Sequence, residues 1–191
     1  VRVLSLSAQD RASDATMDDF CVLSELGERF PKKSSLGIKL LLEYRAIRRQ
    51  LQGKTDEMIM RLPIMTSKMD AMQMLNLLFF PAYSSQSKYY SFILMRMVSM
   101  SLAHGLCKIS AFAFAMFGTM VCGVSDDIEL GCRHGELLSL KIQGQFRARE
   151  WISHVNCVAY GLLGPWKRPM QECLTPLLVV YKMGLESGDI K

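Results

Sequence analysis

Three histidines and six cysteines are the side chains of this chain best suited to bind a metal or to act as nucleophiles. His104, His134 and His154 are 30 and 20 residues apart, a spacing that fits neither a His-Glu-x-x-His helix nor paired Cys/His knuckles. The cysteines stand at irregular intervals, mostly inside apolar runs, without a Cys-x-x-Cys pair. They are expected to be small buried apolar residues in a reducing, cytoplasmic compartment: Cys21, Cys107, Cys122, Cys132, Cys157 and Cys173.

Other catalytic patterns are also missing from the sequence. There is no Gly-x-Ser-x-Gly elbow for a nucleophilic serine and no Gly-rich phosphate loop ending in Lys-Ser or Lys-Thr. Asp126, Asp127 and Glu129 form an acidic group, but acids at this position are expected to stabilise a helix N-terminus without a metal. The sequence therefore predicts no catalytic, cofactor-binding or metal-binding residue and no cofactor.

Two small groups of cations are candidate contacts for a protein partner. Arg45, Arg48 and Arg49 are spaced i, i+3 and i+4 on one predicted helix, and they form either a partner-docking patch or an ordinary solvated face. Trp166 precedes Lys167 and Arg168 in a predicted turn, where the ring could anchor a partner or stack against the turn itself.

Composition and charge narrow the class of protein. Half of the 191 residues are hydrophobic and the formal net charge is only +5, with no block of like charges that would indicate a nucleic-acid-binding tail. Between Ala71 and Ser125 the only charged residues are Lys88, Arg96 and Lys108. Because each uncharged stretch is shorter than the ~20 residues of a membrane-spanning helix, we expect core helices of a protein with no membrane or nucleic-acid partner.

The apolar residues recur with helical spacing along most of the chain. The predicted fold class is all-α, with antiparallel helical hairpins stacked as a tetratricopeptide-like α-solenoid. Glycines at 105, 144 and 188 close successive hairpins at spacings of 39 and 44 residues. We expect one array over residues 1–191, a fragment of a larger chain, with hairpins at 17–52, 68–105, 110–144 and 145–188.

Local signals predict where these helices begin, end and pack. A helix over 14–30 is expected to end before Pro31, a helix over 68–80 to be capped by Thr66 or Ser67 and ended by Pro81, and Pro176 to kink the last helix or shift its start. Around 123–127, a glycine is expected to end one helix and Ser125 to cap the next. The expected core face of the helix over 37–52 comprises Leu40, Leu41, Tyr44, Ile47 and Leu51.

The segment Ser-Ala-Phe-Ala-Phe-Ala-Met-Phe-Gly alternates small and large residues. Its small residues are expected to let a neighbouring helix approach closely while the phenylalanine rings fill the remaining space. These small residues are Ala111, Ala113, Ala115 and Gly118.

Several short motifs occur in a recognisable order. They are LPIMT at 62–66, PAY at 81–83, LMRMV at 94–98, HG at 104–105 and SAFAFAMFG at 110–118. Together they resemble the tetratricopeptide-like helical region of large sensor histidine kinases that carry an AAA/STAND ATPase module. In that family a serine/threonine-kinase-like head and the ATPase precede the repeats, and GAF and histidine kinase modules follow them.

The resemblance implies a non-catalytic scaffold within a signal-transduction protein. Its partners would be the adjoining ATPase and kinase or GAF modules of the same polypeptide, or other proteins and peptides. The family's ATP-binding and phospho-acceptor motifs have no counterpart here, so the resemblance assigns no catalytic residue. Two alternatives stay open: a free-standing adaptor that binds peptides, and a small helical protein whose Met- and Phe-rich interior holds an apolar ligand.

Overall fold

The computed structural model describes residues 27–28, 30–31, 33–125, 127–147 and 149–187, and within these ranges it contains helices and no strand. The all-α prediction is confirmed, whereas the helix expected over 14–30 lies largely outside the described residues. The chain divides into two compact units. Unit 1 comprises Val1–Thr55 and Pro63–Gly105, and unit 2 comprises Asp56–Leu62 and Leu106–Lys191. The single array expected over 1–191 stays a prediction.

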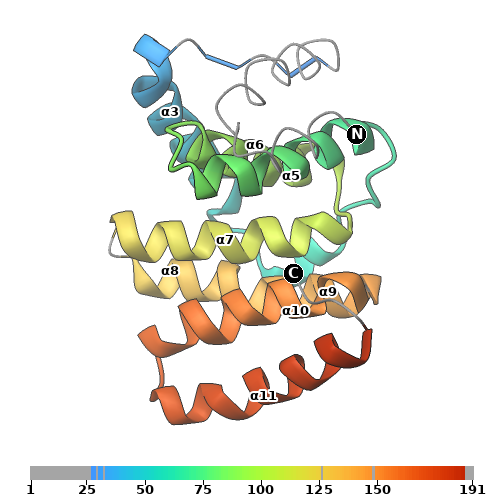
Figure 1. Cartoon of the computed structure of the whole chain (residues 1–191). Coiled ribbons are helices and arrows are strands. Elements are labelled where there is room, and N and C mark those ends of the chain that lie inside the picture. The colour runs from blue at the N-terminus through green and yellow to red at the C-terminus, as the bar shows by residue number, and fades with distance from the viewer. Residues whose placement is uncertain (1–26, 29, 32, 126, 148, 188–191) are drawn as a thin grey trace. The chain divides into compact units, whose positions relative to one another are not determined.

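Unit 1 is built around helix α6, Tyr90–His104. The helix packs against α5, Met69–Ser84, and against α3, Leu36–Leu51, which follows the short turn η1, Lys33–Ser35 (Figure 1). α5 and α6 fall within the range predicted for one hairpin, and α6 ends at the expected glycine. Gly105 has φ +104°, and a Cβ there would collide with the carbonyl of Pro63, so only glycine fits this stop.

Two predictions about α5 were wrong. The helix starts after Lys68, which has φ +70° and provides no side-chain cap, so neither Thr66 nor Ser67 caps it. It also continues through Pro81 to Ser84. Proline deprives the carbonyl of Leu77 of its usual donor, but Leu77 is 41% exposed, and water can bind that carbonyl on the outer side of the helix.

The core face of α3 was predicted only in part. Ile47 and Leu51 are buried together with Leu36, whereas Leu41 is 49% exposed. Packing against α6 uses the face that carries Ile47 and Leu51, about a third of a turn away from Leu41. One face of α3 is therefore left open.

An ion network holds α6 inside unit 1. Arg96 donates to Glu28 at 2.6 Å and to Glu43 of α3 at 2.9 Å, and Lys68 lies 3.2 Å from Glu28. Burial by itself lowers the pKa of Arg96, but the hydrogen bonds and charges of Glu28 and Glu43 outweigh it, so the pKa is raised. Arg96, which is the one cation of α6 apart from its terminal histidine, is thus held in ion pairs within unit 1.

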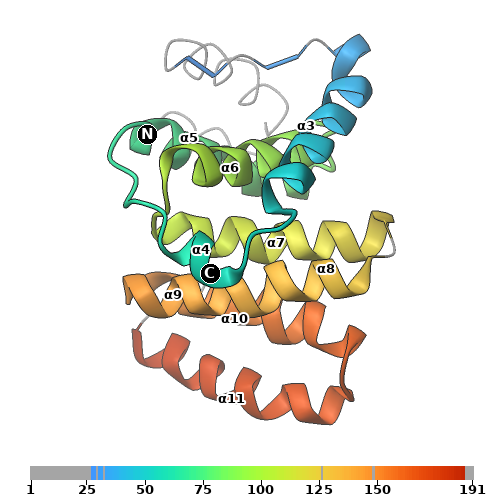
Figure 2. The same cartoon turned by 180° about the vertical axis from the view of Figure 1, so that it is seen from behind.

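Unit 2 consists of a short helix followed by successive longer helical runs (Figure 2). The chain leaves unit 1 after Thr55, forms α4, and returns to unit 1 at Pro63. The π-helical turns η2 and η4 interrupt two of the longer runs without breaking them. The elements are α4 Asp56–Met60, α7 Lys108–Ser125, α8 Ile128–Cys132, η2 Arg133–Leu138, α9 Ser139–Phe146, η3 Arg149–Trp151, α10 Ile152–Asn156, η4 Cys157–Leu163, η5 Gly164–Trp166 and α11 Met170–Ser187.

Helix α7 is the central helix of unit 2. By length and composition it could cross a membrane, so the expectation that this stretch is too short for a span was wrong. Its surroundings favour a core helix instead, since 72% of it is buried and α8, η2 and α9 pack along it.

Glycines let α7 and the neighbouring run approach at backbone distance. A Cβ at Gly118 would collide with the backbone of Gly131 and Gly135, and a Cβ at Gly135 would collide with Gly118. The surrounding alanines and phenylalanines are fully buried: Ala111, Ala113, Ala115, Phe112, Phe114 and Phe117. The predicted small-against-large packing is confirmed.

Helix ends in unit 2 differ from prediction between Gly123 and Asp127 and at Gly144. Asp127, not Ser125, caps α8 by accepting from the Leu130 amide at 3.2 Å, while Ser125 belongs to the last turn of α7 and donates to Val121. α7 runs through Gly123 instead of ending there, and α9 runs past Gly144 to Phe146. α11 starts at Met170 and contains Pro176, so the proline does not shift its start, and the alternative of a kink at Pro176 stays a prediction.

Candidate functional site

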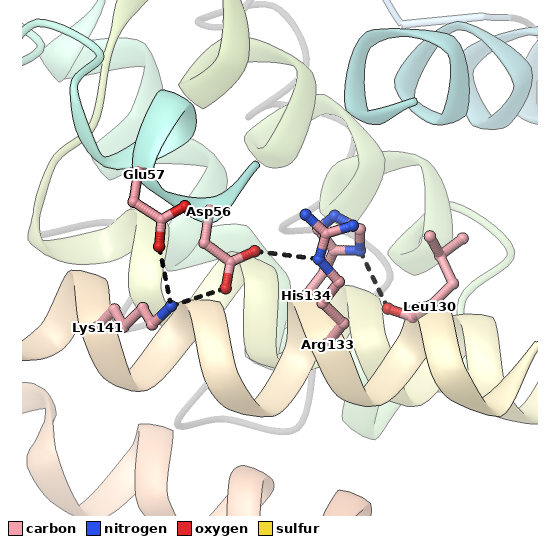
Figure 3. A network of polar contacts seen from close by, with 6 residues as sticks. All are labelled: Asp56, Glu57, Leu130, Arg133, His134 and Lys141. Atoms are coloured by element: carbon pink, nitrogen blue, oxygen red, sulfur yellow. Dashed lines mark hydrogen bonds and ion pairs between the residues drawn. The ribbon is translucent and has the colours of Figure 1, made fainter. Parts of the chain in front are cut away.

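The most connected polar cluster of unit 2 joins α4 to the run that contains η2 and α9 (Figure 3). The Asp56 carboxylate accepts from Arg133 at 3.1 Å and from Lys141 at 2.8 Å. Glu57 lies 4.0 Å from Lys141. Because Asp56 is only 12% exposed, while both cations are close to half exposed, the cluster has a buried acidic centre and a solvated basic rim.

The charge of Asp56 depends on these two cations. Burial by itself raises the pKa of Asp56, but the hydrogen bonds and charges of Lys141 and Arg133 outweigh it and hold the pKa below its usual value. Asp56 is therefore an ionised anchor for α4, a helix that has only five residues and one buried apolar side chain, Ile59.

His134 lies beside this cluster with its ring fully buried. Its Nδ1 is 3.0 Å from the Leu130 carbonyl, which makes Nδ1 the protonated nitrogen of a neutral ring, and Nε2 has no hydrogen-bond partner. Burial lowers the pKa of His134, and the opposing hydrogen bond to Leu130 is too weak to restore it. A neutral imidazole sealed from solvent can neither exchange protons with a substrate nor be reached by one.

A second buried carboxylate uses one of the predicted contact residues. Glu136, in η2, pairs with Arg168, whose guanidinium also lies 5.7 Å from the centre of the Tyr160 ring. Arg168 therefore ties the turn before α11 to η2. Trp166 and Lys167, by contrast, are exposed, with Trp166 at 49%.

The predicted arginines of α3 all lie on the open face of that helix. Arg45 and Arg49 have no ion-pair partner among the described residues. The same face carries Ile38 and Leu42, which are 70% and 57% exposed. This surface of mixed apolar and basic side chains was predicted only in its basic half.

The cysteines are mostly the inert residues that the sequence predicts. Cys107, Cys122, Cys132 and Cys173 are buried, and burial together with the neighbouring Cys132 raises the pKa of Cys122 to about 11, so its thiol is protonated at neutral pH. Cys157 is exposed, which corrects its expected burial. Within the described ranges, no three His, Cys, Asp or Glu side chains are grouped as metal ligands.

The described part of unit 1 has a surface hollow that sequence reasoning missed. It has a volume of about 440 Å³ and lies where α5 turns into α6, lined by Tyr83, Ser84, Gln86, Ser87, Lys88, Tyr90 and Ser91. The available signal was the density of hydroxyl groups between two apolar helices. With a single cation in its lining and no acid, the hollow could bind a small polar or anionic molecule.

The sequence analysis also missed the ion pairs of Asp56. Asp56 lies in the first turn of α4, where an acid stabilises the helix N-terminus. Arg133 and Lys141 stand 77 and 85 residues away, so no local spacing could have revealed the pairing. The arrangement attaches the inserted helix α4 to the run that contains η2 and α9.

No protein-family model, curated protein or solved structure matches this chain. The resemblance to the helical region of signalling ATPases therefore stays a hypothesis.

Proposed function

We propose that the chain is a non-catalytic helical-repeat scaffold within a multidomain, cytoplasmic signalling ATPase or kinase. In this role its helices form a tetratricopeptide-like array that contacts adjoining modules of the same polypeptide. The motif resemblance suggests the setting, and the layered helical runs of unit 2 are compatible with it.

The observation that carries the proposal is the open apolar face of α11. Its exposed apolar residues Leu174, Leu178, Tyr181 and Leu185 are spaced 4, 3 and 4, which aligns them in one row along the helix. Each is between 49% and 65% exposed, although α10 and η4 cover the opposite side of α11. A continuous apolar row of this kind favours coverage by another helix.

The test compares this chain with a version extended by the next ~40 residues of its reading frame, one repeat length. We expect the extended protein to aggregate less and the α11 amides to exchange more slowly, because a following helix would cover the apolar row. The matched control is Leu174→Ser with Leu178→Ser, which should raise the solubility of the shorter chain only. Equal solubility and equal exchange in the two proteins would contradict the proposal.

The reading frame separates the scaffold from a free-standing adaptor. A phosphate-loop ATPase encoded upstream and a GAF or histidine kinase module downstream would support the scaffold. A frame that encodes neither would favour the adaptor, which would use the same open face of α11 for a separate partner.

A ligand-binding role has one observation in its favour, the hollow at Tyr83 and Tyr90. It differs from the apolar pocket considered from the sequence, because its lining is hydroxyl-rich and the phenylalanines of α7 are buried by packing. Stabilisation of unit 1 by inorganic phosphate or by a small aromatic carboxylate, lost in Lys88→Ala, would support that role.

A further inference from the structure

The open face of α3 combines two kinds of side chain in a fixed order. Ile38, Leu41 and Leu42 are 70%, 49% and 57% exposed on the first half of the helix. Arg45 and Arg49 follow on the same face of the second half, and Arg48 flanks them. The face is therefore apolar at one end and basic at the other.

The spacing along this face suits a second helix. Ile38, Leu42, Arg45 and Arg49 are separated by 4, 3 and 4 residues, the repeat that keeps one row of a helix against a straight helical neighbour. From Ile38 to Arg49 the row extends for about 17 Å along the 16-residue helix and offers four successive layers of contact.

The packing of α3 on α6 does not account for these residues. α6 packs on the other side of α3, where Leu36, Ile47 and Leu51 are buried. Cations in the last turn suit the negative end of the helix dipole, which explains Arg48 and Arg49. The dipole does not explain three large exposed aliphatic residues about two to three turns earlier.

From this juxtaposition we propose that the α3 face binds a protein partner through an amphipathic helix that has apolar residues opposite Ile38 and Leu42 and acidic residues opposite Arg45 and Arg49. Charge complementarity selects the acidic half, because Arg45 and Arg49 have no carboxylate within the described part of the chain. Glu43, the only acid of α3, is already bound to Arg96.

The same physics sets the direction of the partner helix. Acidic residues stabilise the N-terminal turns of a helix, so the acidic half of the partner is favoured at its N-terminus. That half meets Arg45 and Arg49, at the C-terminal end of α3, only when the two helices are antiparallel. The dipoles of the two helices then also oppose each other favourably.

An anionic membrane is a weaker fit to this face. Surface-binding helices combine several cations with aromatic or long apolar anchors, and lipid-binding basic segments contain about four to eight Lys or Arg residues. The face of α3 has two arginines without an ion-pair partner among the described residues and no aromatic residue, and its cations are gathered at one end of the helix.

This inference deepens the proposed scaffold role but concerns a different helix from α11, so the two can fail separately. The probe is a helical 16-residue peptide with Glu in its N-terminal half and Leu in its C-terminal half, placed to face the α3 row. Binding to the 191-residue chain is measured by fluorescence anisotropy. We expect saturable binding that weakens at least about tenfold between 50 mM and 500 mM salt, because exposed charges are screened.

Variants of the chain identify the face. Arg45→Glu with Arg49→Glu should weaken binding about tenfold or more, and Leu42→Ser should weaken it severalfold. Lys39→Glu is the matched control, because Lys39 is an exposed cation of the same helix that lies off the row, and it should change binding less than about twofold. Circular dichroism checks that each variant keeps its helical content.

A charge swap separates direct contact from a folding effect. A peptide with Lys in place of Glu should bind the Arg45→Glu, Arg49→Glu variant better than it binds the original chain. Binding that is equal for the two peptides, or equally reduced by Lys39→Glu, would overturn the proposal. Association with anionic vesicles that depends on Arg45 and Arg49, in the absence of peptide binding, would assign the face to a membrane instead.

Discussion

The two units bring their helices together by opposite means. In unit 1, large rings fill the space where α5 meets α6: Phe79 stacks on Tyr83 at 6.1 Å and meets Tyr90 edge-on at 6.4 Å. In unit 2, α7 meets α8 and η2 through glycines whose backbones almost touch. The first contact depends on side-chain volume and the second on the absence of side chains, so they should respond oppositely to added or removed atoms.

The two units also use their charged residues differently. Unit 2 uses Arg133, Lys141 and Arg168 in pairs that attach α4 and the turn before α11. Unit 1 uses Arg96 in this manner, whereas Arg45 and Arg49 of α3 have no acidic partner in the part of unit 1 that the structure describes. An arginine that is committed to folding, such as Arg96, thus differs from one that is available for binding, such as Arg45, only in its surroundings.

The largest effect is expected from emptying the ring cluster of unit 1. Phe79 is 1% exposed, and Phe79→Ala should destabilise unit 1 by about 3–5 kcal/mol through loss of burial and creation of a cavity. Phe80→Ala, at a neighbouring position that is 43% exposed, should cost less than about 1 kcal/mol. Urea unfolding followed by hydrogen exchange of α5 and α6 peptides measures both, and similar losses would contradict the ring-packing account.

Adding one methyl group should separate the units most clearly. Gly118→Ala should destabilise unit 2 by about 2 kcal/mol or more, because the new Cβ meets backbone that cannot rotate aside. Gly123→Ala, in the same helix with open space around it, should be neutral or stabilise by up to about 1 kcal/mol. Fluorescence of Trp151 and Trp166 reports unit 2, and a harmless Gly118→Ala would refute close backbone packing.

The buried histidine should make unit 2 sensitive to mild acid. Because the folded-state pKa of His134 is below the unfolded value of about 6.5, the unfolded state binds more protons between these two pKa values. The stability that the neutral His134 ring contributes is therefore fully present above about pH 6.5 and decreases as the pH falls toward the folded-state pKa. Unfolding detected by tryptophan fluorescence from pH 7.5 to 5 measures this loss, which should be smaller in His134→Gln. Hydrogen exchange of peptides from α5 and α6 should show no such loss in unit 1.

The smallest effect is expected at the anchor of α4. Asp56→Asn should cost about 1 kcal/mol or less, because Arg133 and Lys141 are 40% and 46% exposed and solvent screens both pairs. The pKa of Asp56 is lowered on folding, so its contribution is present above the unfolded value of about 3.9 and disappears as the pH falls through the folded pKa.

Glu57→Gln is the control for that anchor. Glu57 is 73% exposed and its carboxylate lies 4.0 Å from Lys141, so the change should leave unfolding nearly unaltered. Hydrogen exchange of residues 56–60 measures both variants. Faster exchange in Glu57→Gln than in Asp56→Asn would show that Glu57, and not Asp56, anchors α4.

Sequence patterns located most helices because their signals are local. Gly105 marks the end of α6 by requiring a positive φ, and Met72, Leu75 and Leu78 predict the buried side of α5 by their spacing. The rule that a proline ends a helix failed at Pro81, where α5 continues to Ser84. A proline removes one hydrogen bond, and the packing of the remaining turns can outweigh that loss.

The candidate surfaces were predicted less completely than the helices. The sequence singled out Arg45, Arg48 and Arg49 as one basic face, and all three are exposed. It grouped Arg168 with Trp166 and Lys167, but Arg168 is bound to Glu136. Leu41 was assigned to the core and is exposed instead, which hid the apolar half of the α3 face.

By itself, the sequence determined the all-helical class, most helix ranges and the close packing of small residues around Gly118. These features can be predicted because periodicity, glycine stops and side-chain volume act within a few turns. The tertiary structure decided which cations are paired, which side of α3 is open, and that α4 belongs with residues far along the chain. Those outcomes depend on partners 32 to 85 residues away, such as Glu136 for Arg168 and Lys141 for Asp56. Long-range pairing of this kind leaves no periodic trace in the sequence, since each partner looks like an ordinary surface charge on its own helix.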